Sequence, residues 1–416
     1  MKNNISYQLT GPFREIVTLA GLPLKGALKD EALQVIPSGG ILWREGMIEA
    51  VGAFEALAKT PGAVITESRT GGVVLPGFID MHTHIAFGGT RADDFALRNG
   101  GSSYLEIAEN GGGIWSTVKA TRDLDQQELA QLTAQRADAL LRQGITTIEV
   151  KSGYGLSVEE ELKSLRAVQD AGRIAKADLI ATCLAAHTLP KDFNGPPGAY
   201  LELMARELLP LVKSGQLAHR VDAFVEKGAF SAAQILPYFR EAKALGFAIT
   251  VHADQFSTSG SEVAVKTGAL SADHLESATE KAIALLAGSS VIATALPGAS
   301  IGLGCAFAPA RKLLDAGCSL AIATDWNPGS APMGALMTQA SILACFEKLT
   351  NAEVLAALTF RAAAALALRD RGVLTSGYNA DFICYDADSY KEIIYQQGRL
   401  QPVQVWKNGV CVMNRE

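Results

Sequence analysis

Short apolar segments alternate with helical segments through the middle of the chain, and this alternation constrains the fold more than any other feature. Most of these segments are rich in Val, Ile, Ala and Thr, as expected for strands buried on both faces. Eight of them are predicted to be strands: 78–84, 146–150, 179–186, 221–226, 248–253, 271–275, 291–296 and 320–324. Eight strands alternating with helices predict an α/β fold, the (β/α)8 or TIM barrel. A doubly wound open sheet has similar local patterning, but the count of eight favours the barrel.

The helical segments carry their own boundary signals. The segment 127–143 has the clearest pattern, because its leucines and Ala137 recur on one face. Gly144 is predicted to cap the end of this helix. Ser157 followed by Glu160 has the form of a capping box and predicts the start of the next helix.

Both ends of the chain are β-rich. The segment 41–52 has the pattern strand, turn, strand around Glu45-Gly46, and 403–413 repeats it around Asn408-Gly409, a strong hairpin signal. The segment 380–387 predicts a further strand. We therefore expect a small composite β-sandwich built from both ends of the chain. The predicted domains are 1–70 with 370–416 for the β-sandwich, and 71–369 for the barrel.

Composition excludes several classes of protein. The chain has 416 residues, 48% of them hydrophobic and 19% charged, which excludes intrinsic disorder. The net charge of −6, without a basic block, argues against nucleic acid as a partner. No apolar run is long enough to span a membrane, and the N-terminus lacks the apolar core of a signal peptide. With six cysteines and no Cys-x-x-Cys pair, we expect reduced thiols and a cytoplasmic location.

Five of the six histidines fall at or just after the carboxyl ends of predicted strands. They are His82, His84, His187, His252 and His274, and Asp325 directly follows the eighth strand. Active sites of barrel enzymes form at this rim. A single histidine at a strand end is more often structural, but five at one rim predict a functional site. His219 precedes the fourth strand, at the opposite rim, and is expected to be structural or exposed.

The spacing His82-x-His84 predicts a metal site. Residues i and i+2 of a strand point to the same face, so the two imidazoles can grip one cation. His252 and Asp325 complete a set of three neutral nitrogens and one carboxylate, which suits zinc or iron and acidifies a bound water. His274 is expected to be a fifth ligand or the group that positions this water.

The motifs HTH, HAD, DH and TDWNPG resemble those of the amidohydrolase superfamily. Longer segments, PGFIDMHTHIAFGGTRADDF, YLEIAENGGGIWSTVKATR, EVKSGYGL and ATDWNPGSAP, are similar to the imidazolonepropionase family, and the resemblance covers nearly the whole chain. It implies that water opens the ring of 4-imidazolone-5-propanoate to give N-formimidoyl-L-glutamate, in histidine degradation. The alternatives are another cyclic-amide hydrolase, an aminohydrolase (deaminase) of the superfamily, and a catalytically inactive scaffold, which would have broken metal ligands.

The resemblance also implies substrate contacts. Arg91 is expected to clamp the substrate carboxylate, although a surface ion pair with Asp93 or Asp94 is its alternative role. Tyr154 and His187 are further substrate-binding positions, and His187 is expected to hydrogen-bond the ring carbonyl oxygen. Three positions after the eighth strand complete the set, and each could instead serve only the turn: Asn327, Gly329 and Ser330.

Gln255 stands where many deaminases of the superfamily, and some imidazolonepropionases, place a glutamate that shuttles a proton. An amide cannot relay a proton as a carboxylate can. Gln255 is therefore expected to contact the substrate ring, and the proton transfer is assigned to His274, Asp325 or the attacking water.

One zinc or iron ion per chain is expected. Binuclear relatives bridge two metals with a carboxylated lysine at the end of strand four, where this chain has Glu226, with Lys227 on the other face. Lys151 lies at the end of strand two, so a second metal bridged by Glu226 remains the less favoured alternative. Gly111–Gly113 is expected to form an active-site loop rather than a phosphate-binding loop. A homodimer is expected from the family.

Overall fold

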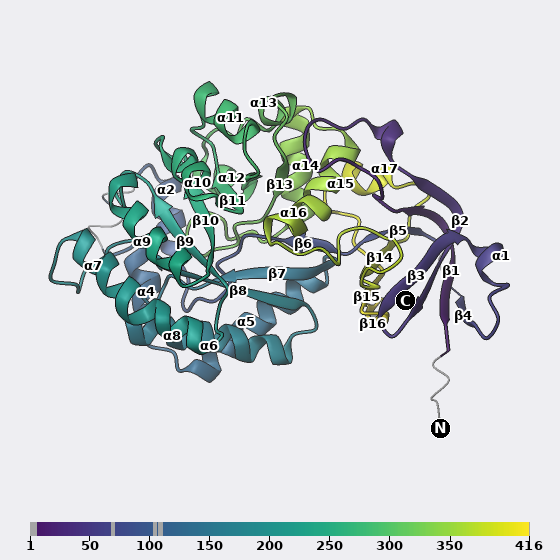
Figure 1. The fold of residues 1–416 in the computed structure, drawn as a ribbon, viewed down its shortest axis with the longest axis horizontal. Helices are drawn as coiled ribbons and strands as arrows, with labels where there is room; N and C mark the ends of the chain where they lie inside the picture. The colour runs from purple at the N-terminus through teal and green to yellow at the C-terminus, as the bar shows by residue number, and fades with distance from the viewer. Residues whose placement is uncertain (1–5, 68–70, 103–105, 107–110, 416) are drawn as a thin grey trace.

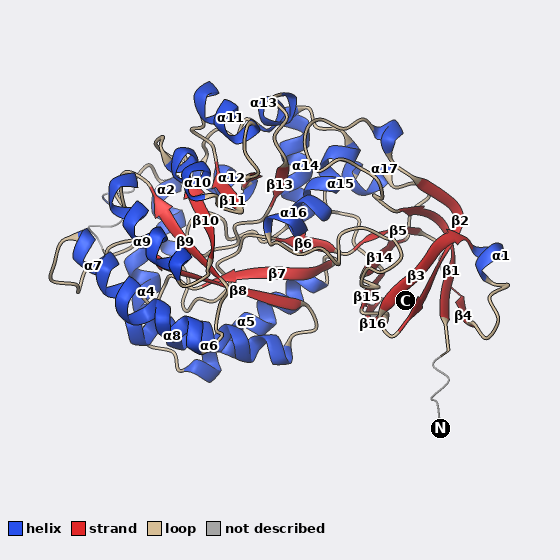
Figure 2. Ribbon diagram, in the orientation of Figure 1, coloured by secondary structure: helices blue, strands red, loops and turns tan. Residues whose placement is uncertain are grey.

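The computed structural model describes residues 6–67, 71–102, 106 and 111–415. These residues form a parallel eight-stranded sheet wrapped in helices and a second sheet built from the two ends of the chain (Figure 1). Figure 2 shows the helices gathered around the parallel sheet, with the second sheet at one end of the molecule. The motif 104–122, similar to the family, lies partly outside the described residues, and its described part from Ile114 to Arg122 is helical.

The parallel sheet is a closed barrel, and all eight predicted strands are confirmed. Each strand pairs with its neighbours in sequence. The strands are β6 (Phe78–Asp80), β7 (Ile145–Lys151), β8 (Asp178–Ala186), β9 (Arg220–Val225), β10 (Ala248–Ala253), β11 (Ser271–His274), β12 (Ile292–Ala295) and β13 (Leu320–Ile322). The N–H of Asp325 donates to the His82 carbonyl at 3.0 Å, and the N–H of His84 donates to the Trp326 carbonyl at 2.9 Å. These bonds join the last strand to the first, which excludes the open sheet.

Helices cover the outside of the barrel. Their bounds are α2 (Ala92–Asn99), α4 (Ile114–Arg122), α5 (Gln126–Leu141), α6 (Val158–Ile174), α7 (Pro197–Leu203), the π-helix η2 (Met204–Leu208), α8 (Leu209–Ser214), α9 (Ala232–Ala244), α10 (Gly260–Thr267), α11 (Glu280–Ala287), α12 (Pro297–Leu303), α13 (Ala310–Asp315), α14 (Leu336–Glu347), α15 (Asn351–Ala357) and α16 (Phe360–Ala365). Their apolar faces pack on the strands, as Leu140 and Leu165, both fully buried in the main core, illustrate.

Two helix boundaries were predicted from the sequence. Ser157 Oγ accepts a hydrogen bond from the Glu160 N–H at 3.2 Å, so α6 starts where predicted. The end of α5 differs, because Arg142 is its C-cap and the helix stops at Leu141. Gly144 instead forms the tight entry into β7, with φ of 90°. The predicted cap thus serves the strand that follows, where only glycine is unstrained.

The second sheet is assembled from both ends of the chain, as predicted. Its order is β16 (Val410–Asn414), β15 (Gln404–Lys407), β14 (Phe382–Tyr385), β5 (Val73–Pro76), β1 (Gln8–Val17), β2 (Val35–Arg44) and β3 (Met47–Ala53), with β4 (Val64–Glu67) also paired to β1. Three short helices flank it or lie near it: η1 (Asp30–Ala32), α1 (Phe54–Leu57) and α17 (Lys391–Tyr395). The ends of the chain meet where β14 pairs with β5.

Both predicted hairpin turns are confirmed. Glu45 and Gly46 have φ of 52° and 79°, and Asn408 and Gly409 have φ of 49° and 74°. Positive φ at both central positions is the geometry that two-residue hairpins favour. The strand β5 at 73–76 belongs to the second sheet, although it lies within the range 71–369 predicted for the barrel. The exact division of the domains at residues 70 and 370 stays a prediction.

Polar contacts tie the second sheet to the barrel. Arg371 Nη1 lies 2.5 Å from Asp178 Oδ2 and donates to Thr147 Oγ1 at 2.9 Å. Lys407 Nζ lies 2.9 Å from the same Asp178 oxygen and 2.8 Å from Asp381 Oδ2. These contacts hold the sheet against the amino ends of β7 and β8, away from the rim that carries the histidines. Among the described helices, none has the length and apolar character needed to cross a membrane.

We expect Gly144→Ala to lower the free energy of unfolding by about 1–3 kcal/mol, because alanine is strained at positive φ. Its Cβ would also lie 3.0 Å from Ile383 Cδ1, across the interface between the barrel and the second sheet. Denaturant unfolding measures the change. The matched control is Gly198→Ala in α7, where a Cβ would meet nothing within 4 Å and should not destabilise the protein. Equal stability of both variants would contradict this account.

Candidate metal centre and active site

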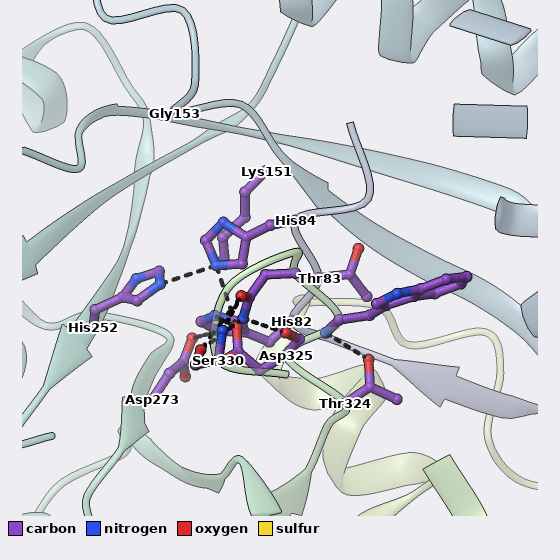
Figure 3. Close-up of polar contacts among 12 residues, drawn as sticks. His82, Thr83, His84, Lys151, Gly153, His252, Asp273, Thr324, Asp325 and Ser330 are labelled. Atoms are coloured by element: carbon purple, nitrogen blue, oxygen red, sulfur yellow. Dashed lines mark hydrogen bonds and ion pairs between the residues drawn. The ribbon is translucent and has the colours of Figure 1, made fainter. Parts of the chain in front are cut away.

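Four histidines and Asp325 converge at the carboxyl rim of the barrel. Figure 3 shows three of them, His82, His84 and His252, together with Asp325. His82 and His84 follow β6, His252 lies in β10, His274 ends β11, and Asp325 follows β13. All five side chains are buried. His274 and Asp325 have φ of 92° and 52°, conformations that non-glycine residues adopt at an energetic cost. Such strain gathers at functional sites.

The nitrogen and oxygen atoms of these side chains face one another closely. His84 Nε2 lies 3.4 Å from Asp325 Oδ1 and 3.2 Å from His252 Nε2. His82 Nε2 lies 3.6 Å from the same Asp325 oxygen. Two groups can hold a metal, His82 with His84 and His252, and His82 with His274 and Asp325, each with its ligand atoms within 4.8 Å of one another. Because both groups contain His82, they describe one centre.

Carboxylates behind the imidazoles set the direction in which the rings face. His82 Nδ1 lies 2.7 Å from Asp273 Oδ2, and His252 Nδ1 lies 2.9 Å from Asp222 Oδ2. A proton on each Nδ1 leaves the Nε2 lone pair for a ligand in front, as in metal sites of proteins. His82 Nε2 is buried without a hydrogen-bond partner among the described residues. The arrangement therefore fits a metal ion.

Burial also sets the protonation of the cluster. Burial lowers the pKa of His82 and His84 well below the ordinary value and that of His252 to about 4, so these imidazoles are neutral near pH 7, the form that binds metals. Burial raises the pKa of Asp325 to about 7, which disfavours its charged form, and a metal cation bound beside it would offset this cost.

His274 differs from the other histidines of the cluster. Burial acts to lower its pKa, but Glu276, Asp325 and Asp273 outweigh burial and the pKa is raised. Its Nδ1 lies 3.5 Å from Glu276 Oε1, and its ring centroid lies 5.3 Å from that of His252. A histidine that favours its protonated form beside neutral imidazoles suits proton transfer.

Arg91 makes one of the ion pairs expected of it and also lies at the rim. Its Nε lies 2.7 Å from Asp94 Oδ2, which also accepts a hydrogen bond from the Gly113 N–H at 2.9 Å. A Cβ placed on Gly329 would lie 2.4 Å from Arg91 Nη1, so the guanidinium rests directly against this glycine. The Asp94 bridge occupies Nε and fixes the plane of the guanidinium.

Tyr154 and His187 line the same site. The His187 ring stacks on His84 with centroids 5.4 Å apart, and Tyr154 lies 5.5 Å from His187. His187 Nδ1 lies 2.9 Å from the Gly153 carbonyl oxygen, an acceptor, so Nδ1 carries a proton. Burial lowers the pKa of His187, so its Nε2 carries a lone pair and accepts hydrogen bonds.

The segment after β13 is held by its own hydrogen bonds. Asn327 Oδ1 accepts the N–H groups of Gly329 and Ser330, both at 2.8 Å, and Asn327 Nδ2 donates to the Asp325 carbonyl at 2.7 Å. Asn327 therefore shapes the turn that carries Asp325 and Gly329. Gln255 is buried in the loop after β10, where its backbone carbonyl oxygen accepts a hydrogen bond from Ser277 Oγ at 3.0 Å.

The residues weighed for a second metal have other partners. Glu226 accepts the Lys227 N–H at 2.8 Å and the Phe256 N–H at 2.9 Å, and it is also bonded by Ser257 Oγ. Lys151 Nζ lies 2.8 Å from Glu149 Oε1 and 2.9 Å from Asp222 Oδ2. His219 is exposed, away from the cluster.

Three residues of the centre were missed in the sequence, Glu149, Asp222 and Asp273, and Lys151 was considered only as a bridge between two metals. All four are ionisable residues inside or at the end of otherwise apolar strands. All four are buried in the barrel interior. Charged residues are seldom buried unless they are paired, so their presence in such strands could have indicated a paired network.

Comparison with known proteins identifies the family of the chain. The model of the amidohydrolase family matches residues 73–412. An imidazolonepropionase of Symbiobacterium thermophilum is 40% identical over 409 residues, which covers 96% of both chains. An imidazolonepropionase of Phocaeicola vulgatus is 40% identical over 378 residues, covering 90% of this chain and 91% of the relative.

Solved structures with the same fold are more distant. A triazine hydrolase variant superposes with a TM-score of 0.74 at 16% identity, covering 99% of this chain and 95% of the other. An adenosine deaminase from Xanthomonas campestris with bound zinc has a TM-score of 0.71 at 19% identity, covering 99% and 93%. At this identity the likeness supports the fold, a barrel joined to a small β domain.

Proposed function

Because the chain belongs to the amidohydrolase family and, within it, to the imidazolonepropionases, we propose that it opens the ring of 4-imidazolone-5-propanoate with water. The protein is thus a hydrolase of cyclic-amide C–N bonds, in histidine degradation. One observation carries the proposal: relatives of this name match 96% of the chain at 40% identity. The buried cluster of histidines and Asp325 at the barrel rim supplies the chemistry such a reaction needs.

The metal ligands we propose are His82, His84, His252 and Asp325, holding one zinc or iron ion per chain. A single ion is supported because both groups with metal-binding geometry share His82. Glu226 also accepts hydrogen bonds from Phe256 and Ser257 in the loop after β10, which argues against a second, bridged ion. When bound, zinc or iron supplies a Lewis acid that activates water and polarises a carbonyl.

Arg91 is proposed to bind the propanoate carboxylate of the substrate. Its Nε is occupied by Asp94, which leaves the two terminal nitrogens for a bidentate contact. The absence of a side chain at Gly329 lets the guanidinium lie against the turn after β13. Ser330 and Asn327 are proposed to complete this end of the substrate site, Asn327 mainly by shaping the turn.

Tyr154, His187 and Gln255 are proposed to orient the imidazolone ring. Because the Nδ1–H of His187 points to the Gly153 carbonyl, Nε2 accepts a hydrogen bond from a ring N–H rather than donating to the ring carbonyl. This revises the role expected from the sequence. The Tyr154 hydroxyl and the Gln255 amide are of the donor type that the carbonyl and the carboxylate of the substrate require.

Proton transfer is proposed to fall to His274 and Asp325. Water adds to the ring carbonyl carbon, the C–N bond breaks, and the departing nitrogen takes a proton. His274 turns Nδ1 to Glu276, which leaves Nε2 to hold or release that proton near Asp325. We also propose a cytoplasmic location, supported by a sequence whose six cysteines include no Cys-x-x-Cys pair. The homodimer stays a prediction.

Purified enzyme should consume freshly prepared 4-imidazolone-5-propanoate, with loss of the imidazolone absorbance and formation of N-formimidoyl-L-glutamate. No ammonia should be released at a rate matching turnover, because the ring opens without deamination. A coupled ammonia assay run in parallel distinguishes the two reactions. Ammonia released in step with the absorbance change would favour the aminohydrolase alternative.

Elemental analysis of the wild type should show about one zinc or iron per chain. His252→Ala should lose most of it, because three protein ligands of the remaining set hold the ion less tightly. His219→Ala is the matched control, since this histidine is exposed at the other rim and should leave the metal content unchanged. Two tightly bound metals per wild-type chain would contradict the single-ion proposal.

Arg91→Ala should raise KM by about 10–100-fold, which corresponds to the loss of a charge-assisted contact of about 1.5–3 kcal/mol. Arg91→Lys should fall between wild type and alanine, because the charge remains but the bidentate geometry is lost. Arg206→Ala, on the exposed outer surface, is the control and should leave KM unchanged. A wild-type KM for Arg91→Ala at unchanged thermal stability would place the carboxylate contact elsewhere.

Gln255→Ala should weaken substrate binding but retain substantial kcat, because an amide cannot act as the base. His274→Ala should lower kcat by about 100-fold or more. The two pH–rate profiles should be compared at equal metal content. If Gln255→Ala abolishes turnover while His274→Ala stays nearly as active as wild type, the roles are inverted.

A further inference from the structure

Lys151 is a buried cation for which the proposed reaction has no role. It ends β7, and none of its surface is exposed. Its ammonium lies between two carboxylates, 2.8 Å from Glu149 Oε1 and 2.9 Å from Asp222 Oδ2. Figure 3 shows Lys151 beside His84, at the centre described above. Each of the two carboxylates contacts a different part of the proposed metal-ligand set.

Glu149 hydrogen-bonds to Thr83, the residue between His82 and His84. Its Oε2 accepts the N–H of Thr83 at 3.3 Å, and its carbonyl accepts Thr83 Oγ1 at 2.6 Å. The N–H of Lys151 itself donates to the Thr83 carbonyl at 3.0 Å. Two residues of β7, Glu149 and Lys151, therefore hydrogen-bond to Thr83, the central residue of the His-x-His segment.

Asp222 contacts both the backbone and the ring of His252. Its Oδ1 accepts the N–H groups of Ala223 at 2.7 Å and of His252 at 3.2 Å. Its Oδ2 faces two cationic or donor groups at 2.9 Å each, Lys151 Nζ and His252 Nδ1. The ammonium therefore touches the same oxygen atom that orients the His252 ring.

We propose that Lys151 is a positioning residue that sets the spacing between His252 and the His82–His84 segment before the metal binds. The ammonium holds Glu149 and Asp222 at one distance from each other, and each carboxylate fixes one part of the ligand set. Without the ammonium, two buried carboxylates would repel each other and the Asp222 carboxylate would turn away from its present direction. The inference rests on the proposed metal site.

A purely structural role makes a different prediction. A buried cation between two carboxylates stabilises the fold wherever it stands, and its loss would lower the stability of the protein without changing the metal affinity of the molecules that remain folded. Arg220 provides the comparison inside the same barrel. It is buried, donates to Thr182 Oγ1 at 3.2 Å and lies 4.0 Å from Glu149, but it touches neither Asp222 nor Asp273 within ion-pair distance.

The test is zinc titration of chelator-treated protein, with folding monitored by circular dichroism at the titration temperature. Lys151→Met should bind zinc about 10–100-fold more weakly than wild type, the range seen when groups behind metal ligands are lost. Asp222→Asn should show a similar loss. The double variant should be no weaker than the weaker single variant, because both changes disturb one path to His252. Arg220→Met should be less stable but bind zinc within about twofold of wild type.

The outcomes separate this inference from the proposed function. If wild-type protein binds no metal, the proposed metal site fails. If wild type binds zinc and folded Lys151→Met binds it equally well, or if the losses in the double variant simply add, the positioning role is wrong. Should Lys151→Met not fold, Lys151→Arg replaces the test, because it keeps a charge between the two carboxylates but changes their spacing. Its zinc affinity should still be reduced, and an affinity equal to wild type would overturn the inference.

Discussion

The rest of the site depends on the contacts between imidazole Nδ1 atoms and buried carboxylates. Asp273 behind His82 and Asp222 behind His252 determine which ring nitrogen carries the proton and which faces the centre. An isolated imidazole can present either nitrogen and rotate about two side-chain bonds. With Nδ1 occupied, each ring has one direction and one lone pair available. His82 and His252 are therefore already oriented toward the centre in the folded chain.

This arrangement requires charges inside the barrel. The interior of such barrels is usually filled by branched apolar side chains, but here Glu149, Lys151, Asp222 and Asp273 occupy it. Burying a charge is costly unless it is paired. The ion pairs of Lys151 with Glu149 and Asp222 offset that cost, and burial in turn keeps the imidazoles neutral. The burial that these ion pairs make possible therefore also keeps the imidazoles in the neutral form that binds a metal ion.

Much of the fold followed from the sequence because its signals are local. Strand segments, the Asn408-Gly409 turn and the positions of the histidines depend on neighbouring residues and on a period of two. The composite sheet was predictable because both ends of the chain have the same β-rich pattern. Gly144 was assigned to the wrong role because a glycine at positive φ serves a helix cap and a strand entry equally well.

What the sequence could not provide was the pairing of side chains from different strands. The contact of His82 with Asp273 joins β6 to β11, across 191 residues, and depends on the side-chain directions inside the closed barrel. The same holds for Asp222 with His252 and for the Nδ1–H of His187, whose acceptor is the carbonyl of Gly153. Likewise, the alternative roles of Arg91 could not be separated, because its guanidinium both pairs with Asp94 and lies against Gly329.

X-ray absorption spectroscopy of the metal-loaded enzyme tests the central claim most directly, because it reports the ligands around the ion itself. The account predicts a first shell of nitrogen and oxygen only, with the outer-shell scattering of three or four imidazoles and no neighbouring metal. The four imidazole case corresponds to His274 as an additional ligand. A sulfur ligand, one imidazole or none, or a second metal at about 3.5–4 Å would contradict the claim that these inward-facing histidines hold a single ion.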